Sequence, residues 1–360
     1  MVETATSIAR AVAVPRQHHS KRSSTAARLA GAAAALAAVA VFNAWRARKT
    51  EQRHPPGGRF VEVDGVRLHF LEQGKGPPVV LLHGNIVSAD DWVLSSVLDR
   101  VAQRHRVIAF DRPGYGYSDR PQGSAWGAAA QADLLLRAFE ALRIERPVVV
   151  GHSWGTNAAL ALALADPTAI SGLVLLSGYY NPTVRADALL VAPAAAPVVG
   201  DVLRYTVSPL FGAATLPLLV KGMFAPLPVP ERFRRGFSHG MALRPWQIRA
   251  EAQDGVTMAP GVAAMRDRYP ELRMPVAIMV GSVDRVVDVG RHSIRLHEQI
   301  PHSELRVVPG VGHMVHHAVP DEVAQMIETI ASGPTGQRKL TTRSDATAGS
   351  GFGAEIGAAA

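Results

Sequence analysis

Three residues of the chain are of the types that together cleave acyl bonds: a serine, a histidine and an aspartate. Ser153 lies in the segment GHSWG, between three valines and a run of helix-forming residues. A serine hydroxyl is a weak nucleophile at neutral pH, so it needs a base, and the base needs a carboxylate to orient it. His313, in GVGHMVHH, is the candidate base, and Asp284, in GSVDRVV, is the candidate carboxylate. The corresponding chemistry is nucleophilic attack on a carbonyl carbon.

The glycines around Ser153 fit a sharp turn between a buried strand and a helix. Gly151 and Gly155 lie two residues before and two residues after the serine. Side chains at these positions would collide with the neighbouring strand and helix. The N-terminus of the following helix would direct free N–H groups to the place where an oxyanion forms. We therefore interpret Ser153 as a nucleophile; the alternative is an ordinary serine in a glycine-rich connection.

Buried strands alternating with helices would position these residues. The short apolar segments PPVVLLHG, HRVIAFD, RPVVVGH, ISGLVLLSG, MPVAIMVG and ELRVVPG are typical of strands covered on both faces. Helical stretches at 128–142 and 157–165 separate some of them, which indicates a parallel sheet between two helical layers. FVEVDGVRLHFLEQG predicts a hairpin that precedes this sheet. Asp284 and His313 each follow a predicted strand, so both should lie at the carboxyl edge of the sheet.

The chain divides into a basic N-terminus, an apolar run, a globular body and a tail rich in glycine, alanine, serine and threonine. No convincing buried strand occurs between Tyr180 and about Met274, and some 90 residues are too many for a loop in a compact domain. This stretch predicts a mostly helical insertion, a lid. The expected boundaries are a disordered basic segment 1–28, an apolar helix 29–45, a linker 46–58, a domain 59–332 with its lid at about 180–272, and a disordered tail 333–360.

The apolar run LAGAAAALAAVAVFNAW (29–45) has three interpretations. As a helix it would be about 25 Å long, near the lower limit for crossing a bilayer. An uncleaved membrane anchor is the favoured interpretation, with flanking basic residues at the interface. A cleaved secretory signal is the second, because AVA at 38–40 resembles a cleavage site; the protein would then be secreted or periplasmic. A soluble alanine-rich helix or an organellar transit peptide is the third.

Charge and cysteine content exclude several classes of protein. The net charge is +8, but residues 1–58 carry nine basic and two acidic side chains, so the rest of the chain is nearly neutral. A basic surface for nucleic acid is therefore not predicted. The chain contains no cysteine, which excludes disulfides, thiolate metal sites and a cysteine nucleophile.

From about Phe60 to Ile330 the chain resembles the α/β-hydrolase fold family, in its lid-bearing serine hydrolase branch. The segments that carry the resemblance are LLHGN, DRPGYGYSD, GHSWG, GSVDRVV and GVGH. Their order and spacing are specific for the family but not for a substrate. The resemblance implies an α/β fold with a mostly parallel, doubly wound eight-stranded sheet, helices on both faces and a helical lid insertion. It also implies the order serine, acid, histidine along the chain.

The same resemblance implies an oxyanion hole made of two backbone N–H groups. In the family these belong to the residue after His-Gly, which is Asn85 here, and to the residue after the nucleophile, which is Trp154. His83 and His152 are interpreted as structural histidines. Asp111 is interpreted as a residue that shapes the bend DRPGYGYSD beside the oxyanion loop.

Each member of the candidate triad has a rival nearby. Asp288 competes with Asp284, which stands closer to the end of its strand. His316 and His317 compete with His313, and HMVHH also permits a metal cluster, although no carboxylate ligand stands nearby in the sequence. We expect Ser153, Asp284 and His313 to be the catalytic residues, with no metal and no cofactor.

The expected function is that of a serine hydrolase acting on a carboxylic ester or a related acyl bond. Family members that act on haloalkanes or epoxides carry an aspartate at the nucleophile position, where this chain has Ser153. The expected partners are a small, apolar acyl substrate and a membrane bound through residues 29–45, with no nucleic acid. The aromatic residues of the predicted lid favour an apolar substrate, and packing of the lid on the core explains them equally well. The alternatives are a lyase or cofactor-free peroxidase on the same fold, and a non-catalytic, membrane-anchored interaction module.

Overall fold

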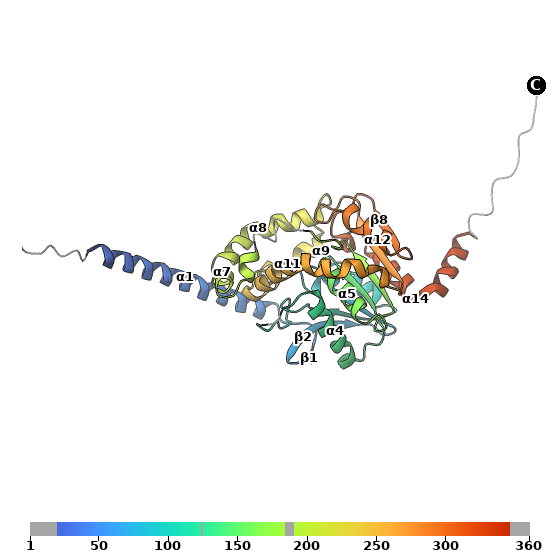
Figure 1. Cartoon of the computed structure of the whole chain (residues 1–360), viewed down its shortest axis with the longest axis horizontal. Coiled ribbons are helices and arrows are strands. Elements are labelled where there is room, and N and C mark those ends of the chain that lie inside the picture. The colour runs from blue at the N-terminus through green and yellow to red at the C-terminus, as the bar shows by residue number, and fades with distance from the viewer. Residues whose placement is uncertain (1–19, 124, 184–190, 346–360) are drawn as a thin grey trace, which may run out of the picture.

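The computed structural model describes residues 20–123, 125–183 and 191–345. Its centre is one sheet of eight strands in the order β1-β2-β4-β3-β5-β6-β7-β8 (Figure 1). β2 is antiparallel to both of its neighbours, and all other pairs are parallel. The strands are β1 (Arg59–Val63), β2 (Val66–Gln73), β3 (Pro78–Leu82), β4 (Arg106–Phe110), β5 (Val148–His152), β6 (Gly172–Leu176), β7 (Val276–Gly281) and β8 (Glu304–Val308).

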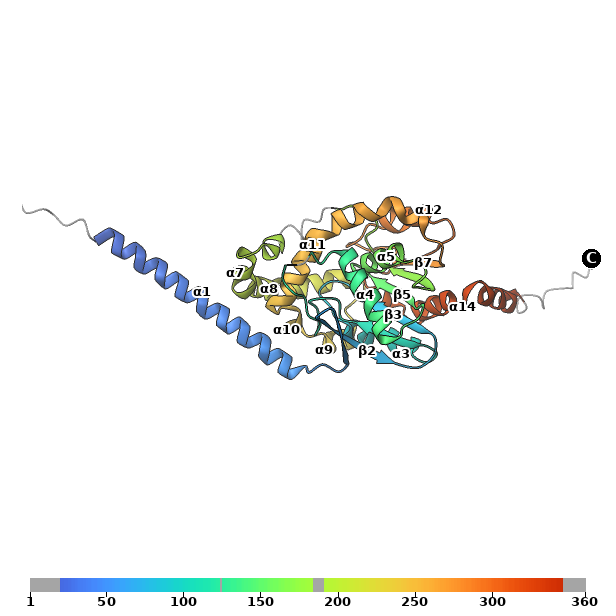
Figure 2. The same ribbon diagram turned by 60° about the horizontal axis from the view of Figure 1, so that its bottom comes forward.

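Helices cover both faces of this sheet, which confirms the predicted α/β class (Figure 2). α4 (Ala128–Leu142) and α5 (Gly155–Ala165) pack on one face, and α3 (Val97–Val101) and α14 (Pro320–Asp345) on the other. Successive strand residues point to opposite layers. Val80 and Leu82 belong to the α4–α5 layer, whereas Val79 and Leu81 belong to the α3–α14 layer. Because both faces are buried, these strands are apolar at every position rather than alternating.

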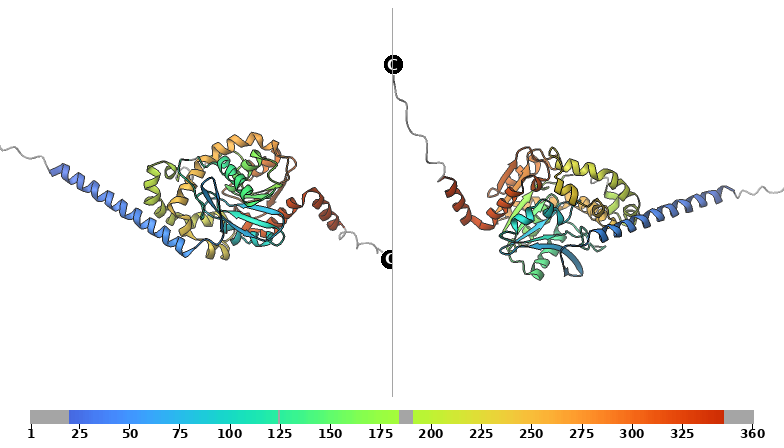
Figure 3. Two further views of the ribbon diagram at one scale, coloured as in Figure 1. Left: turned by 90° about the horizontal axis from the view of Figure 1, so that it is seen from below. Right: turned by 180° about the vertical axis from the view of Figure 1, so that it is seen from behind.

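A helical insertion connects β6 to β7, where the sequence predicts a lid at about 180–272. Its described elements are η1 (Ala192–Ala195), α7 (Val199–Tyr205), α8 (Val207–Phe224), α9 (Glu231–Gly236), α10 (His239–Ala242), α11 (Pro245–Met265) and η2 (Arg266–Glu271). Residues 184–190 lie outside the described part of the chain. The insertion forms the helical mass between α1 and the carboxyl ends of the strands (Figure 3).

The N-terminal helix is longer than the predicted apolar run. α1 extends from Ser20 to Arg53, so it includes the end of the segment expected to be disordered and most of the expected linker 46–58. Residues 46–53 continue the helix because RARKTEQR lacks glycine and proline and is rich in good helix formers. Figure 2 shows α1 running out from the body at one end. Residues 1–19 of the predicted disordered segment lie outside the described residues.

The C-terminal helix also passes the boundary predicted for the tail. α14 continues to Asp345, although the tail was expected to begin at 333. Gly333 has a φ of +64° and divides α14 into two helices at a kink. Pro334 then occupies the first position of the second helix, which suits its fixed φ, and Gln, Arg, Lys and Leu follow. Residues 346–360 lie outside the described part of the chain.

Candidate active site

Ser153 lies on the turn between β5 and α5, in a strained backbone conformation. Its φ is +52°, in the left-handed region that non-glycine residues rarely adopt. A Cβ atom at Gly151 would come within 2.7 Å of the Cα of Thr156, and one at Gly155 would collide with the carbonyl oxygens of Leu82 and His83. Glycine is therefore required on both sides of Ser153, for the steric reason that the spacing predicts.

Ser153, His313 and Asp284 form a line of hydrogen bonds, although they lie far apart in the chain. The Oγ of Ser153 is 3.0 Å from Nε2 of His313, and Nδ1 of His313 is 2.9 Å from Oδ2 of Asp284. Asp284 follows β7, and His313 lies between β8 and α13 (Val315–Ala318). Because a carboxylate accepts, Nδ1 of His313 carries the proton, and Nε2 is free to accept the proton of the serine hydroxyl.

Asp284 is held in place by the backbone that follows it. Its Oδ1 accepts hydrogen bonds from the N–H groups of Val286 (2.8 Å) and Val287 (2.9 Å). Burial alone would raise the pKa of the Asp284 carboxyl, but the His313 imidazole and these two N–H groups hold it below its usual value. The rival carboxylate, Asp288, accepts instead from the N–H of Arg291 at 2.6 Å. The structure thus places Asp284, and not Asp288, against His313.

Asn85 and Trp154, the residues expected to form an oxyanion hole, lie beside the cavity that contains Ser153. Both residues line that cavity, together with Ser153 and His313. Within the described ranges neither N–H donates a hydrogen bond to the protein. Two unpaired N–H donors beside a nucleophile are suited to stabilise an oxyanion.

The loop that carries Asn85 is held by buried polar side chains. His83 accepts a hydrogen bond at Nε2 from the N–H of Arg112 (2.9 Å) and donates from Nδ1 to the carbonyl of Gly84 (2.6 Å). Burial lowers the pKa of His83 to about 4, so this imidazole is neutral. Asp111 accepts from the N–H of Ala89 at 2.8 Å and from Nδ1 of His69 at 2.7 Å. Both residues have the structural surroundings that their sequence interpretation predicts.

Arg112 is a residue of this site that sequence reasoning missed. Its guanidinium is fully buried and donates to the carbonyls of His83 (2.8 Å) and Gly84 (3.1 Å) and to Oδ1 of Asn85 (2.8 Å). It also forms an ion pair at 2.6 Å with Asp254 of α11. Arg112 therefore connects the loop that carries Asn85 to the helical insertion. Its position two residues after the buried strand β4, within the segment DRPGYGYSD, was the available signal.

Asp254 also contacts the turn that carries the nucleophile. Its backbone carbonyl accepts from the indole Nε1 of Trp154 at 3.0 Å, and its carboxylate pairs with Arg120 at 2.9 Å. The guanidinium of Arg112 stacks on the indole of Trp154, 4.3 Å from the ring centroid. One residue of the insertion thus contacts Trp154 directly and the loop of Asn85 through Arg112. No local sequence pattern marks Asp254, because its partners are 100 or more residues away.

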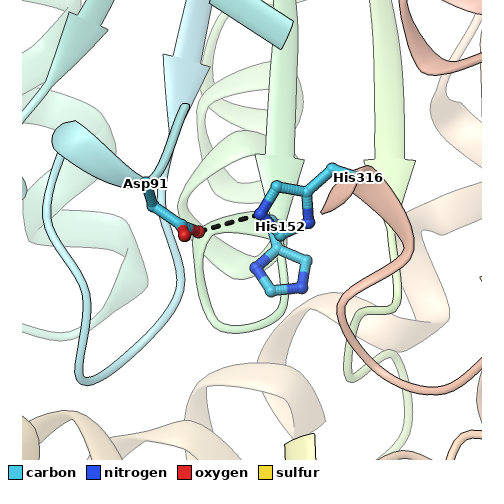
Figure 4. A group of neighbouring side chains, drawn as sticks. All are labelled: Asp91, His152 and His316. Carbon is cyan, nitrogen blue, oxygen red and sulfur yellow. Dashed lines mark hydrogen bonds and ion pairs between the residues drawn. The ribbon is translucent and has the colours of Figure 1, made fainter. Parts of the chain in front are cut away.

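His316 and His317, the rivals of His313, bind a different carboxylate. Their Nε2 atoms lie 2.8 Å from Oδ2 and Oδ1 of Asp91, a buried residue of α2 (Asp90–Leu94). His152 lies against this group, with its ring centroid 4.2 Å from that of His316 (Figure 4). The Nε2 of His152 donates to the backbone carbonyl of His313 at 3.3 Å. We call Asp91, His152, His316 and His317 the sealed cluster.

Burial and hydrogen bonding determine which side chains of the sealed cluster are charged. Burial lowers the pKa of His316 to about 4 and that of His152 well below its usual value. Burial would raise the pKa of Asp91, but the two histidines bound to it hold that pKa well below normal. The cluster is thus an ionised carboxylate bridged by two imidazole N–H donors.

The sealed cluster also contains the donor types that a divalent metal prefers. One ligand atom from each of Asp91, His152 and His316 lies within 4.8 Å of the other two. Both oxygens of Asp91 already accept hydrogen bonds from His316 and His317, so hydrogen bonding accounts for the close spacing. Nδ1 of His152 and Nδ1 of His316 have no partner among the described residues.

A cavity of about 600 Å³ opens above Ser153, between the sheet edge and the insertion. Most of its lining is apolar and comes from both parts, including Ile86, Tyr179, Leu218, Leu219, Met223, Met258 and Val286. Glu251 of α11 is a carboxyl group in this lining. Burial raises the pKa of Glu251 to about 8, so it is protonated at neutral pH. The site can therefore hold an apolar group beside a serine, an imidazole and two N–H donors.

Comparison with known proteins agrees with this architecture. The family model described as the alpha/beta hydrolase fold matches residues 77–318. An uncharacterized protein of Mycobacterium tuberculosis is 30% identical over 292 residues, which are 76% of this chain and 81% of that protein. The 2-hydroxymuconate semialdehyde hydrolase of Pseudomonas putida is 27% identical over 277 residues, 77% of this chain and 95% of that enzyme.

Solved structures show the same fold. That of a membrane phospholipase A, described as a bacterial virulence factor, matches with a TM-score of 0.57 and 22% identity. The match covers 87% of this chain and 99% of that one. The chain therefore belongs to the alpha/beta hydrolase fold family.

Proposed function

We propose that the protein is a serine hydrolase that cleaves a carboxylic ester or a related acyl bond, with Ser153 as nucleophile. The observation that carries this proposal is the unbroken line of hydrogen bonds from Oγ of Ser153 through His313 to Asp284, at the floor of a cavity. Membership of a hydrolase family and hydrolase relatives support it.

The proposed reaction has two steps of acyl transfer. His313 Nε2 takes the hydroxyl proton while Oγ of Ser153 attacks the carbonyl carbon, and the N–H groups of Asn85 and Trp154 bind the resulting oxyanion. The tetrahedral intermediate then collapses, and His313 gives its proton to the leaving oxygen. Water, deprotonated by His313, attacks the acyl-enzyme and releases the acid and the free serine. Asp284 holds the tautomer of His313 throughout and stabilises its charged form.

The lining of the cavity favours an apolar acyl group. Leu218, Leu219 and Met223 of α8 and Met258 of α11 all line the cavity, which is large enough for a lipid-like chain. Asn85, Trp154, Glu251 and Arg285 provide the polar groups of the lining. In this proposal the insertion acts as a lid over the site.

We also propose that α1 anchors the enzyme in a membrane. The helix Thr25–Arg53 contains an 18-residue apolar window of mean hydropathy 1.7, and none of that window is buried against the protein. Trp45 is half exposed at the end of the apolar run, where an interfacial aromatic residue is expected. The structural similarity to a membrane phospholipase supports this location. A signal sequence has the same features, and membrane extraction of the full chain separates the two.

The proposal is tested by comparing two serines at the same edge of the sheet. Ser153→Ala should abolish labelling by a fluorophosphonate probe and hydrolysis of p-nitrophenyl esters of graded chain length. Ser177→Ala is the matched control, because Ser177 is a buried serine that follows β6 and its Oγ has no partner among the described residues. Full activity of folded Ser153→Ala would overturn the proposal. Preference for longer acyl chains would identify the apolar substrate class.

Hydrolysis of a carbon–carbon bond beside a carbonyl is the second candidate. The Pseudomonas putida relative, a 2-hydroxymuconate semialdehyde hydrolase, favours it. Arg285, exposed in the cavity lining, is the basic group that could bind an acidic substrate. Incubation with 2-hydroxymuconate semialdehyde, followed by its absorbance, distinguishes this reaction from ester hydrolysis. Loss of the substrate signal without hydrolysis of any ester would favour the carbon–carbon reaction.

A further inference from the structure

α8 is apolar on all of its sides but is mostly not covered by protein. Its 18 residues have a mean hydropathy of 1.4, and Lys221 is their one charged residue. A helix that is apolar all round normally lies in a protein core or in a membrane. Only 28% of α8 is buried in this structure. The described part of the chain therefore leaves most of α8 open to a membrane or to another protein.

The exposed apolar residues of α8 continue onto the preceding helix. Phe211 is 53% exposed and Leu218 is 71% exposed on α8, and Val198, just before α7, is 74% exposed. Exposed apolar clusters of this kind on soluble proteins mark sites of interaction with proteins or membranes. We call the set the apolar corner; its members are Val198, Val199, Val202, Val207, Leu210, Phe211, Leu218 and Leu219.

The apolar corner lies at the point where α1 would leave a bilayer. Asn43 of α1 donates through Nδ2 to the carbonyls of Tyr205 (2.8 Å) and Thr206 (3.2 Å), at the joint between α7 and α8. The apolar run ends at Trp45, and the basic residues begin at Arg46, about 4.5 Å further along the helix than Asn43. α7 lies beside α1 in Figures 1 and 2. An anchored α1 would therefore bring the corner to the membrane surface.

The same corner contains part of the entrance to the cavity. Leu218 and Leu219 are both exposed, and both line the cavity above Ser153. Val191, before η1, is also exposed and also lines this cavity. A path from the corner to the nucleophile is thus bordered by aliphatic side chains. An acyl chain that enters along this path would pass apolar side chains.

We propose that the apolar corner inserts into the membrane interface, so that the cavity opens into the lipid phase and receives a lipid acyl chain from there. The occupant of the corner is the bilayer, because the corner is continuous with the apolar span of α1. The proposal rests on the proposed anchor and on the proposed hydrolase activity. A second copy of the chain covering α8 is the competing arrangement.

The absence of cysteine from the chain permits a direct test of insertion. Single cysteines at Leu36 in the anchor, Phe211 in the corner and Ile294, in η3 (Gly290–Ile294) outside the corner, would carry an environment-sensitive dye. All three residues are exposed, so none of the substitutions disturbs packing. The full chain is placed in vesicles of phosphatidylcholine and phosphatidylglycerol that contain a spin-labelled lipid quencher. We expect quenching at positions 36 and 211 and none at 294.

Two results would overturn the proposal in distinguishable ways. Quenching at 36 but not at 211 leaves the anchor intact and overturns insertion of the corner. Quenching at neither position overturns the anchor together with insertion. A dye at 211 that is shielded from water but not quenched, with energy transfer between labelled chains, would assign α8 to a contact between two copies instead.

A charge placed in the corner tests the route of the substrate. We expect Leu210→Glu combined with Phe211→Glu to lower hydrolysis of a long-chain ester dissolved in the vesicles about tenfold. Hydrolysis of a short, water-soluble ester should be unchanged, because neither residue lines the cavity. Ile294→Glu is the matched control and should change neither rate. An equal loss on both esters would overturn the proposal, whereas no hydrolysis of either ester by the unaltered chain would overturn the proposed function itself.

Discussion

Two groups of imidazole and carboxylate have their histidines within five residues of each other, at positions 313 to 317, and the two groups differ in surroundings. His313 binds Asp284 at 2.9 Å, and His316 and His317 bind Asp91 at 2.8 Å. The first group touches the hydroxyl of Ser153 and the cavity above it, whereas the side chains of Asp91, His316 and His317 are at most 1% exposed and do not line that cavity. The pairing of histidine with aspartate is therefore not what distinguishes a candidate catalytic group. Access to a nucleophile and to a space for substrate is the difference.

The sealed cluster has a mechanical use that follows from where its members lie. Asp91 belongs to α2, shortly after the loop of Asn85, and His316 and His317 belong to α13, shortly after His313. Their hydrogen bonds fasten the loop of the expected oxyanion hole to the loop of the expected base. His152 adds a third attachment, next to Ser153. The sealed cluster thus holds in position the loops of Asn85 and His313 and the turn of Ser153.

The largest expected effect separates the histidines of the two groups. His313→Gln should lower kcat/KM for a short p-nitrophenyl ester by about 10⁵- to 10⁶-fold, because the hydroxyl of Ser153 then has no base. His317→Gln should lower it less than about tenfold, because its imidazole binds Asp91 alone. Comparable losses in both variants would show that the two groups do not differ in function.

The two carboxylates should differ in which property they support. Asp284→Asn should lower kcat about 10⁴-fold, because an amide does not hold the required tautomer of His313, while the protein stays folded. Asp91→Asn should leave kcat within about tenfold but lower the free energy of unfolding by about 3 kcal/mol, as breaking a buried pair does. Rates with a soluble ester and urea unfolding measure the two properties. A stable but inactive Asp91→Asn variant would show that Asp91 supports the reaction and not only the stability of the fold.

Burial of the sealed cluster predicts how stability depends on pH. The pKa of His316 is about 4 in the folded protein and about 6.5 in the unfolded chain, so the unfolded chain binds more protons between these values. Stability should therefore fall as the pH decreases from about 6.5 to 4, by up to about 3 kcal/mol for this group. Urea unfolding at a series of pH values measures the slope. A flat dependence between pH 7 and 5 would contradict the burial of a neutral His316.

Glu251 is a carboxyl group that binds an amide, whereas Asp284 and Asp91 bind imidazoles. Gln247 donates to it at 3.5 Å, and its pKa of about 8 exceeds that of the unfolded chain. The folded protein binds the extra proton here, so stability should fall as the pH rises from about 4.5 to 8, opposite to the effect of His316. Glu251→Gln should raise the free energy of unfolding at pH 8 by about 1 kcal/mol. The same gain at pH 4.5 would exclude titration as its cause.

Local patterns in the sequence predicted those features that depend on neighbours in the chain. Continuous apolar segments indicated the strands, because both faces of the sheet are buried. The pair Asp64-Gly65 indicated the hairpin, because both residues readily adopt the positive φ that they have in this turn. The turn at Ser153 was readable because its steric limits fall on Gly151 and Gly155. These signals span a few residues, so one sequence suffices to detect them.

Long-range contacts and helix ends were not predicted, for physical reasons that differ. Asp91 and His316 are 225 residues apart, and Arg112 and Asp254 are 142 residues apart, so no spacing in the chain indicates their contact. The end of α1 was placed too early because charged residues after an apolar run resemble a linker as much as a helix. Burial of Ala47 and the ion pair of Glu51 with Arg244 of the insertion favour the longer helix.

The packing of α1 determines where the protein can be cut. Asn43 and Ala47 are buried against the body, and Glu51 forms an ion pair at 2.7 Å with Arg244, whose side chain is 0% exposed. Removal of the whole helix would leave a buried guanidinium without its carboxylate and uncover the joint of α7 and α8. A water-soluble form should therefore start before Asn43 and keep the last turns of α1. Cleavage after Ala40 by a signal peptidase would meet the same requirement, so shedding from the membrane and retention of the fold are compatible.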